Sequence, residues 1–256
     1  MEEKVRRYSI GSLFAGIGGF ELGLERAIPG AYTLWQVEQN NFCQKVLAKH
    51  WPEARIYDDV KNINKNNVEQ VDILCGGFPC QDISTAGRGR GLNGEKSGLW
   101  WEFHRIINEL QPRAVIMENS PAINVRGLGG VLGSLSQIGY DAEWCTISSG
   151  GAFGLPHKRD RWFAIAYPSS IRLQRSRRYN PSKYQKKNTD WKTGKFICAI
   201  QGEALPFMCR AHNGIPSELG EDMMRALGNA IVPQCSEWIG KKLWESGILQ
   251  AGEYNG

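Results

Sequence analysis

Val71-Asp72-Ile73-Leu74-Cys75 is a short apolar run, and Gly76-Gly77-Phe78-Pro79-Cys80 follows it directly. An apolar run of this length ending in two glycines is typical of a buried strand that leads into a loop. Ligands bind at the carboxyl ends of strands in open α/β folds, so Cys80 is expected at such an edge. Pro79 restricts the backbone before Cys80 and can orient the thiol. Cys80 is therefore a candidate nucleophile, although a lone cysteine is more often a small apolar loop residue.

The same strand-to-turn pattern opens the chain. Tyr8 to Phe14 predicts a strand, Ala15-Gly16-Ile17-Gly18-Gly19-Phe20 a glycine-rich turn, and Glu21 to Ala27 the start of a helix. Glycines let backbone approach a ligand, and the amino terminus of a helix attracts an anionic group. Glu21 occupies the place of the third glycine in the dinucleotide-binding fingerprint. The pattern predicts a Rossmann-like corner that binds a nucleoside ligand other than a dinucleotide.

Acidic residues follow the next predicted strands. Ala31 to Val37 predicts a strand that ends at Glu38, about 20 residues past the glycines, where a carboxylate can accept both ribose hydroxyls. The alternative is an ordinary solvent-facing glutamate. Asn40 is expected to cap a helix that reaches His50. Asp58-Asp59-Val60 comes after this helix, and a carboxylate there could accept a hydrogen bond from an adenine amino group.

A further strand is predicted within Gln111 to Pro121, and Glu118 at its end would reach the same edge as Cys80. Beside apolar neighbours, Glu118 could carry a raised pKa and donate a proton. A turn before the predicted strand Arg161 to Tyr167 contains Arg159, and the alternation predicts both guanidinium groups on one face. The other expected elements are a strand at 143–147, helices at 97–110, 131–138 and 221–227, and a final helix that follows Gln234 and runs through Trp244.

Length and composition suit one sizeable domain and a small second one. The chain has 256 residues, of which 41% are hydrophobic, and 30 glycines. An apolar run of about 18 residues is absent, as is a signal-like amino terminus, which favours a cytoplasmic protein. Seven scattered cysteines without a Cys-x-x-Cys pair argue against a disulfide framework and a thiolate zinc site, so no metal is expected.

Basic residues gather between Pro168 and Lys195, where nine Lys and Arg accompany one acid, Asp190. The whole chain carries only +5, so the rest of it is net negative. Aromatic side chains are mixed into the region, which suits a nucleic-acid surface, although a solvated loop has the same charge. The Gly- and Arg-rich stretch Ser84 to Lys96 predicts a loop that closes on an anionic polymer. Candidate nucleic-acid contacts are Ser84, Arg88, Arg90, Arg172, Arg175, Arg177, Arg178, Lys183, Lys186 and Lys187.

These pieces, in this order, resemble the cytosine-C5 DNA methyltransferase family, of a phage, prophage or solitary bacterial type. The resemblance covers residues 9–167 and 225–245. Its most specific parts are Leu13 to Phe20, Gly77 to Gln81, Glu118-Asn119, the turn Pro156 to Arg161, and Gly228 to Gln234.

The resemblance implies an α/β fold, namely a Rossmann-like sheet with helices on both faces that binds S-adenosylmethionine, plus a small irregular basic target-recognition region. The catalytic domain would comprise residues 1–167 with 221–256, and the recognition region residues 168–220. The resemblance also implies that the protein binds double-stranded DNA and that it does so as a monomer. The residues expected to hold S-adenosylmethionine are Phe14, Ala15, Gly16, Gly18, Gly19, Glu38, Asp59, Asn229 and Ala230.

The implied catalytic residues are Cys80, Glu118, Arg159 and Arg161. Cys80 would attack C6 of a flipped cytosine, Glu118 would bind N3 and the exocyclic amine, and the two arginines would steady the base. His157 replaces the usual glutamine of the family, and Gln39 replaces a larger apolar residue. The usual segment before the Asn229 motif is not recognisable, which leaves the support of the recognition region undefined.

Two alternatives remain open, which are methylation of cytosine in RNA and a non-catalytic module that binds S-adenosylmethionine and DNA. Both polymers present phosphate, so the basic region does not separate them. A zinc-dependent cytosine deaminase is excluded, because the chain has no His-x-Glu motif and no cysteine three residues after Cys80.

Overall fold

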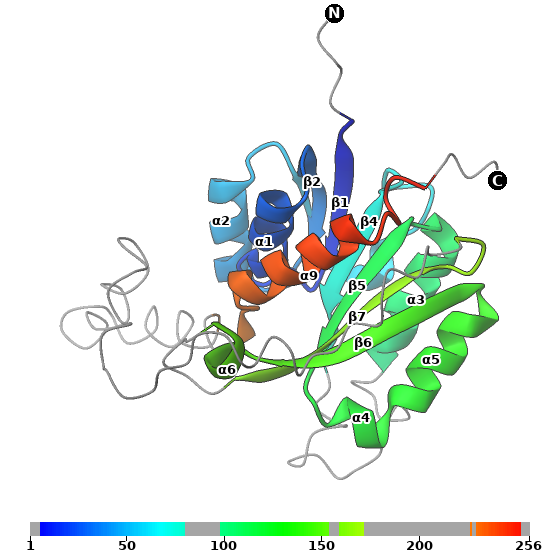
Figure 1. Ribbon diagram of the computed structural model, residues 1–256. Helices are drawn as coiled ribbons and strands as arrows, with labels where there is room; N and C mark the ends of the chain where they lie inside the picture. The colour runs from blue at the N-terminus through cyan, green and yellow to red at the C-terminus, as the bar shows by residue number, and fades with distance from the viewer. Residues whose placement is uncertain (1–5, 80–97, 154–158, 172–225, 227–228, 252–256) are drawn as a thin grey trace, which may run out of the picture.

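The structure is a computed structural model, and it describes residues 6–79, 98–153, 159–171, 226 and 229–251. Within these residues, seven strands form one sheet in the order β3-β2-β1-β4-β5-β7-β6 (Figure 1). The strands are β1 Tyr8–Leu13, β2 Ala31–Val37, β3 Arg55–Tyr57, β4 Ile73–Gly77, β5 Ala114–Asn119, β6 Tyr140–Ser148 and β7 Asp160–Pro168. The helices are α1 Gly19–Ala27, α2 Asn41–His50, η1 Val60–Asn62, α3 Gly98–Leu110, α4 Ile123–Arg126, α5 Leu128–Gln137, α6 Ser149–Phe153 and α9 Pro233–Glu245.

The order of the strands defines where a ligand can bind. Strands β1 to β5 are parallel, whereas β7 runs antiparallel to β5 and β6 antiparallel to β7. The chain builds outward from β1 through β2 to β3 and then returns to place β4 on the other side of β1. This reversal is a topological switch point, and open α/β sheets bind ligands just outside it, at the carboxyl ends of the strands. The predicted α/β class is confirmed.

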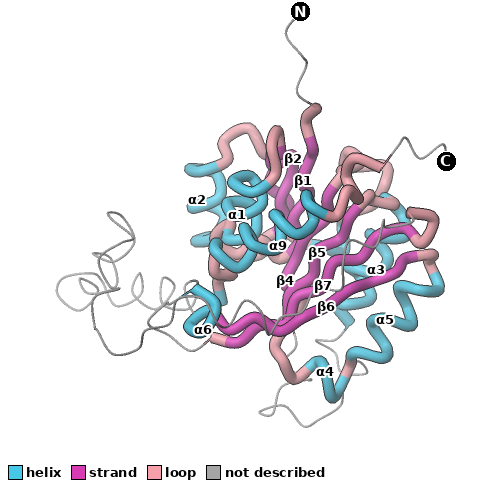
Figure 2. Tube along the Cα trace, viewed as in Figure 1, coloured by secondary structure: helices cyan, strands magenta, loops and turns pink. Residues whose placement is uncertain are grey.

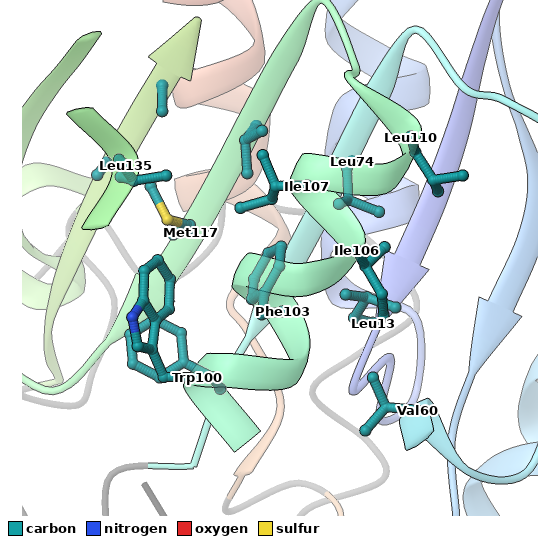
Figure 3. Packing of buried hydrophobic residues seen from close by; sticks show 14 of the residues in the cluster. Leu13, Val60, Leu74, Trp100, Phe103, Ile106, Ile107, Leu110, Met117 and Leu135 are labelled. Atoms are coloured by element: carbon teal, nitrogen blue, oxygen red, sulfur yellow. The ribbon is translucent and has the colours of Figure 1, made fainter. Parts of the chain in front are cut away.

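Both faces of the sheet are covered by helices, as Figures 1 and 2 show. Along β4, Ile73 and Cys75 point to the face covered by α1 and α9, and Leu74 points to the face covered by α3. Figure 3 shows the second face, where Phe103 and Ile107 of α3 pack beside Leu74 and other buried apolar side chains. A strand with apolar residues on both sides is expected when helices cover both faces.

The sequence predicted most of these elements, and the differences have local causes. The expected strand from Tyr8 ends at Leu13 because Phe14 has a φ of 56°. The predicted strand that leads into Gly76 and Gly77 is β4, and it includes both glycines. A Cβ on Gly76 would lie 2.7 Å from the Leu13 carbonyl oxygen, so the glycine permits close pairing with β1. The short helices α4 and α6 were not expected.

Several predictions fall on residues that the structure does not describe. They include the catalytic loop with Cys80 and the predicted helix 221–227, apart from Ala226. The basic region from residue 172 and the boundary of the recognition region at residue 220 belong to the same group. Among the described residues, no helix has the length and apolarity needed to span a membrane. The described part also holds no group of three or more His, Cys, Asp and Glu side chains suited to a metal ion.

Candidate active site

The turn after β1 has an unusual backbone. Phe14, Gly16 and Gly18 have φ values of 56°, 59° and 87°, all in the left-handed region that glycine tolerates best. Ala15 N donates to Val37 O at 3.0 Å, which holds the turn against β2. A Cβ on Gly16 would meet no atom within 4 Å, so the space beside this part of the turn is open.

Gly18 is constrained by packing as well as by its backbone. A Cβ there would lie 2.2 Å from the indole ring of Trp51. Trp51 follows α2, and its Nε1 donates to Glu25 Oε1 on α1 at 3.0 Å. The side chain of Trp51 therefore packs against the turn at Gly18, and a residue larger than glycine at position 18 would displace the indole ring.

Glu38 lies just past the end of β2 and faces the turn. Its Oε2 accepts from Gly16 N and its Oε1 from Asn40 N, both at 2.8 Å. Its main-chain oxygen accepts from Gln44 Nε2 at 2.6 Å. A carboxylate oxygen can accept more than one hydrogen bond, so the group is held in place and still able to bind a ligand. Asn40 caps α2 as predicted, with its side chain accepting from the amides of Phe42 and Cys43.

Asp59 follows β3, the strand next to β2. Its Oδ1 accepts from Lys61 N at 3.0 Å, which starts the short helix η1. Glu38 N donates to Tyr57 O at 2.9 Å, so the ends of β2 and β3 stay paired where the two carboxylates follow. The structure thus brings Asp59 to the same edge of the sheet as Glu38.

The segment before α9 lies against the amino terminus of α1, although the two are far apart in sequence. A Cβ on Gly19 would lie 2.2 Å from the Ile231 carbonyl oxygen. Ser236 Oγ donates to Gly19 O at 2.7 Å, and Figure 1 shows α9 beside α1. Asn229 and Ala230 directly precede Ile231, so they come close to the glycine-rich turn.

Glu118 lies at the carboxyl end of β5 and is mostly buried, with a side-chain exposure of 13%. Its Oε1 is 2.8 Å from Arg161 Nε on the antiparallel strand β7. Burial raises the pKa of Glu118 from 4.5 to about 7, and the positive charges of Arg161 and Arg159 only partly oppose this rise. Glu118 can therefore hold or release a proton near neutral pH. Arg159 directly precedes β7, and the charges of both arginines act on Glu118.

Gly77 at the end of β4 and Asn119 at the end of β5 both lie next to Glu118. A Cβ on Gly77 would lie 2.7 Å from Glu118 Oε2, so a larger residue would push the carboxyl group away. Asn119 is 2% exposed, and its Nδ2 donates to Phe78 O at 3.2 Å. The Phe78 ring packs on Trp100 with 5.0 Å between centroids. The backbone that leads to Pro79 is thus fixed from two sides.

The contact of Asn119 with the Phe78 backbone was not predicted from the sequence. The position of Asn119 directly after a strand-end glutamate was the available signal, but the contact with Phe78 depends on the pairing of β4 with β5. The described residues therefore unite Phe14 to Gly19, Glu38, Asp59, Glu118 and Arg161 at one edge. The edge offers an open glycine-rich turn with a fixed carboxylate, and beside it a carboxyl group with a pKa of about 7.

A family model described as C-5 cytosine-specific DNA methylase matches residues 8–206. The Type II methyltransferase M.CviJI of Paramecium bursaria Chlorella virus IL3A is 35% identical over 157 residues, which cover 60% of this chain and 41% of that protein. The Type II methyltransferase M.HhaI of Haemophilus parahaemolyticus is 30% identical over 166 residues, covering 63% and 50%. The chain spans about half the length of the curated relatives it matches.

Solved structures show the same fold. An E. coli prophage protein described as a DNA modification methyltransferase has a TM-score of 0.54 at 26% identity, covering 65% of this chain and 48% of that one. The Entamoeba histolytica methyltransferase EhMeth has a TM-score of 0.56 at 19% identity, covering 66% and 56%. The second likeness supports the fold alone.

Proposed function

This chain belongs to the C-5 cytosine-specific DNA methylase family, and we propose that it transfers a methyl group from S-adenosylmethionine to C5 of a cytosine in a short site of double-stranded DNA. The observation that carries the proposal is Glu118, a mostly buried carboxyl group with a pKa of about 7 beside the strand end that leads to Cys80. An acid of this kind can bind N3 of cytosine as a proton donor at neutral pH.

The turn after β1 fits S-adenosylmethionine. The space beside Gly16 is open, and the Glu38 carboxylate is held by two main-chain amides at the switch point of the sheet. Glu38 would accept the ribose hydroxyls, Asp59 the adenine amino group, and the turn with Asn229 and Ala230 would enclose the methionine part. When bound, S-adenosylmethionine supplies an electrophilic methyl group on a sulfonium.

Cys80 would act as the nucleophile. Its thiolate would form a bond to C6 of the cytosine as the C5–C6 double bond opens, which raises the electron density at C5, the position that becomes methylated. Loss of the C5 proton would then restore the double bond and expel the Cys80 thiolate. Glu118 would donate its proton to N3 and so absorb the negative charge that develops on the ring. The hydrogen bond from Asn119 Nδ2 to Phe78 O supports the role of Cys80, because it fixes the backbone two residues before the cysteine, next to Glu118.

Arg161 and Arg159 would serve two purposes. Their charges hold the pKa of Glu118 near neutrality against the effect of burial. They would also steady the flipped base and favour the thiolate form of the nearby cysteine. A cytosine inside a duplex cannot reach this edge, so the base must leave the stack.

We further propose that residues 168–220 form the target-recognition region and that residues 1–167 with 221–256 form the catalytic domain. The charge of the 168–195 segment supports a phosphate-binding role for its Arg and Lys residues. The protein would bind the duplex as a monomer.

The test is bisulfite sequencing of a random-sequence plasmid library in a host without cytosine methylation. The wild-type protein is expected to produce methylcytosine within one short motif, and Cys80→Ala to produce none. Transfer RNA incubated with each protein measures the alternative substrate. Methylation of RNA alone, or none in either polymer with folded wild-type protein, would refute the proposal.

A further inference from the structure

One arginine attaches helix α3 to the segment that carries Asp59. Arg105 lies within α3, and its side chain is 33% exposed. Its Nη2 donates to the main-chain oxygen of Val60 at 3.3 Å. Val60 is the first residue of η1 and directly follows Asp59, the proposed partner of the adenine amino group. The contact therefore links α3 to the adenine end of the proposed cofactor site.

The segment 58–72, which joins β3 to β4, depends on such contacts for its position. The structure describes all of it, and the short 3₁₀ helix η1 is its regular element. Val60 and Ile63 are buried in the same apolar cluster as Ile106 of α3, and Figure 3 shows Val60 and Ile106 there. Apolar burial has no preferred direction. It does not by itself fix how the peptide groups around Val60 are turned.

Two carboxylates of α3 hold the Arg105 guanidinium in one orientation. Glu102 Oε2 accepts from Arg105 Nε, and Glu109 Oε1 accepts from Arg105 Nη1, both at 2.9 Å. Residues three and four positions apart lie on one face of a helix, which brings the three side chains together. A guanidinium is planar, so fixing Nε and Nη1 also fixes the direction in which Nη2 donates.

Glu109 gives the segment a second attachment to α3. Its other carboxylate oxygen, Oε2, accepts from Lys65 N at 3.1 Å. Arg105 orients this carboxylate by binding its Oε1. Arg105 thus acts on the segment directly at Val60 and, through Glu109, at Lys65.

We propose that Arg105 is a positioning residue that fixes the backbone at Asp59 and Val60, so that the Asp59 carboxylate selects adenine over hypoxanthine in the cofactor. Asp59 Oδ1 accepts from Lys61 N, and Asp59 O accepts from Asn62 N, both at 3.0 Å, so the Asp59 side chain follows the orientation of η1. A carboxylate accepts from the amino group of adenine, whereas hypoxanthine has a carbonyl oxygen there and offers no donor. The selectivity rests on the proposed function, and the attachment of the segment to α3 does not.

The first test measures by calorimetry the binding of S-adenosylhomocysteine and of S-inosylhomocysteine, which carries hypoxanthine in place of adenine. The wild type is expected to prefer S-adenosylhomocysteine. Arg105→Met keeps the aliphatic stem but removes the hydrogen bonds of the guanidinium, so the preference is expected to fall about tenfold at equal folded fraction. An unchanged preference would refute the positioning role, because lost stability alone weakens the binding of both ligands equally.

Arg113→Met is the matched control. Arg113 also joins a carboxylate to a main-chain oxygen, since its Nε is 3.5 Å from Asp72 Oδ1 and its Nη1 donates to Ala251 O at 2.9 Å. Asp72 directly precedes β4 and Arg113 directly precedes β5, so the pair lies at the amino ends of the strands, away from Asp59. Arg113→Met is expected to keep the wild-type preference. A fall equal to that of Arg105→Met would assign the effect to general destabilisation and overturn the proposal.

Arg105→Lys separates the direction of the hydrogen bonds from the charge. Lysine keeps a positive charge beside Glu102 and Glu109, but its ammonium group does not reproduce the planar fork of the guanidinium. The preference for S-adenosylhomocysteine is expected to fall in this variant as well. A wild-type preference in Arg105→Lys would show that charge alone suffices, and it would refute the directional role of Nη2.

The second test needs no cofactor, because it measures amide hydrogen exchange of the unliganded protein by mass spectrometry. Peptides covering residues 59–68 are expected to exchange faster in Arg105→Met than in the wild type, and at the wild-type rate in Arg113→Met. Unchanged exchange of residues 59–68 in Arg105→Met would refute the attachment. Failure of the wild type to bind either ligand would instead refute the proposed function, and hydrogen exchange would still decide whether Arg105 holds the segment.

Discussion

Replacing Glu118 with glutamine should stabilise the protein at alkaline pH and leave its stability almost unchanged in acid. The pKa of Glu118 rises from 4.5 to about 7 on folding, and its side chain is only 13% exposed. Each pKa unit corresponds to about 1.4 kcal/mol, so the ionised group costs the folded state about 3 kcal/mol. Glutamine has the shape of the protonated acid and does not ionise.

The sign follows from the raised pKa. Below pH 4.5 the carboxyl group is protonated in the folded and unfolded chains, and its contribution to stability is fully present. As pH rises from 4.5 towards about 7, the unfolded chain loses the proton first, and the folded state is progressively destabilised. The advantage of Glu118→Gln should therefore grow over this range and level off above about pH 7.

The assay is urea unfolding of both proteins at a series of pH values. All other ionisable groups are common to the two proteins, so their effects cancel in the difference. Glu109→Gln is the matched control with the opposite sign, because hydrogen bonds and charge from Arg105 outweigh burial and lower the pKa of Glu109. Parallel stability curves for the wild type and Glu118→Gln would refute the reasoning.

Three further substitutions test the site. Asn119→Ala removes the donor to Phe78 O and should lower the free energy of unfolding in urea by about 1–3 kcal/mol. The variant should also form the covalent complex with DNA containing 5-fluorocytosine more slowly. An unchanged rate of complex formation would contradict the role of Asn119 in holding Phe78. Gly18→Ala should lower the melting temperature, since a Cβ there collides with Trp51, and a simultaneous Trp51→Ala should recover part of the loss; no recovery would exclude the collision as the cause. Arg161→Ala removes a cation that opposes burial, so the pKa of Glu118 should rise above about 7; an unchanged carboxyl midpoint in a ¹³C NMR titration would contradict this.

Much of the fold was predictable from local patterns. The strand Ala31–Val37 was predicted with its observed bounds, and the capping role of Asn40 at α2 was correct. Alternating or continuous apolar residues and turn residues are local signals, so they identify strands and helices without knowledge of the partners. The position of Glu38 and Glu118 at strand ends followed from the same patterns.

The pairing of distant segments was not predictable in this way. Gly76 and Gly77 have the composition of a loop, yet they belong to β4. Leu13 and Glu118 lie so close to them that a side chain at these positions would not fit. In the sequence, Asn119 is only the residue after the candidate acid Glu118. Its hydrogen bond to Phe78 O depends on the pairing of β4 with β5.

Local periodicity and motifs therefore identify the class of the fold and the residues expected at the edge of its sheet. The chemistry of these residues depends on tertiary contacts. The pKa of Glu118 depends on burial and on Arg161 from an antiparallel strand, and burial against the sheet likewise raises the pKa of Glu21. Burial and hydrogen-bond balance arise from contacts between segments far apart in the chain, and no local pattern encodes them.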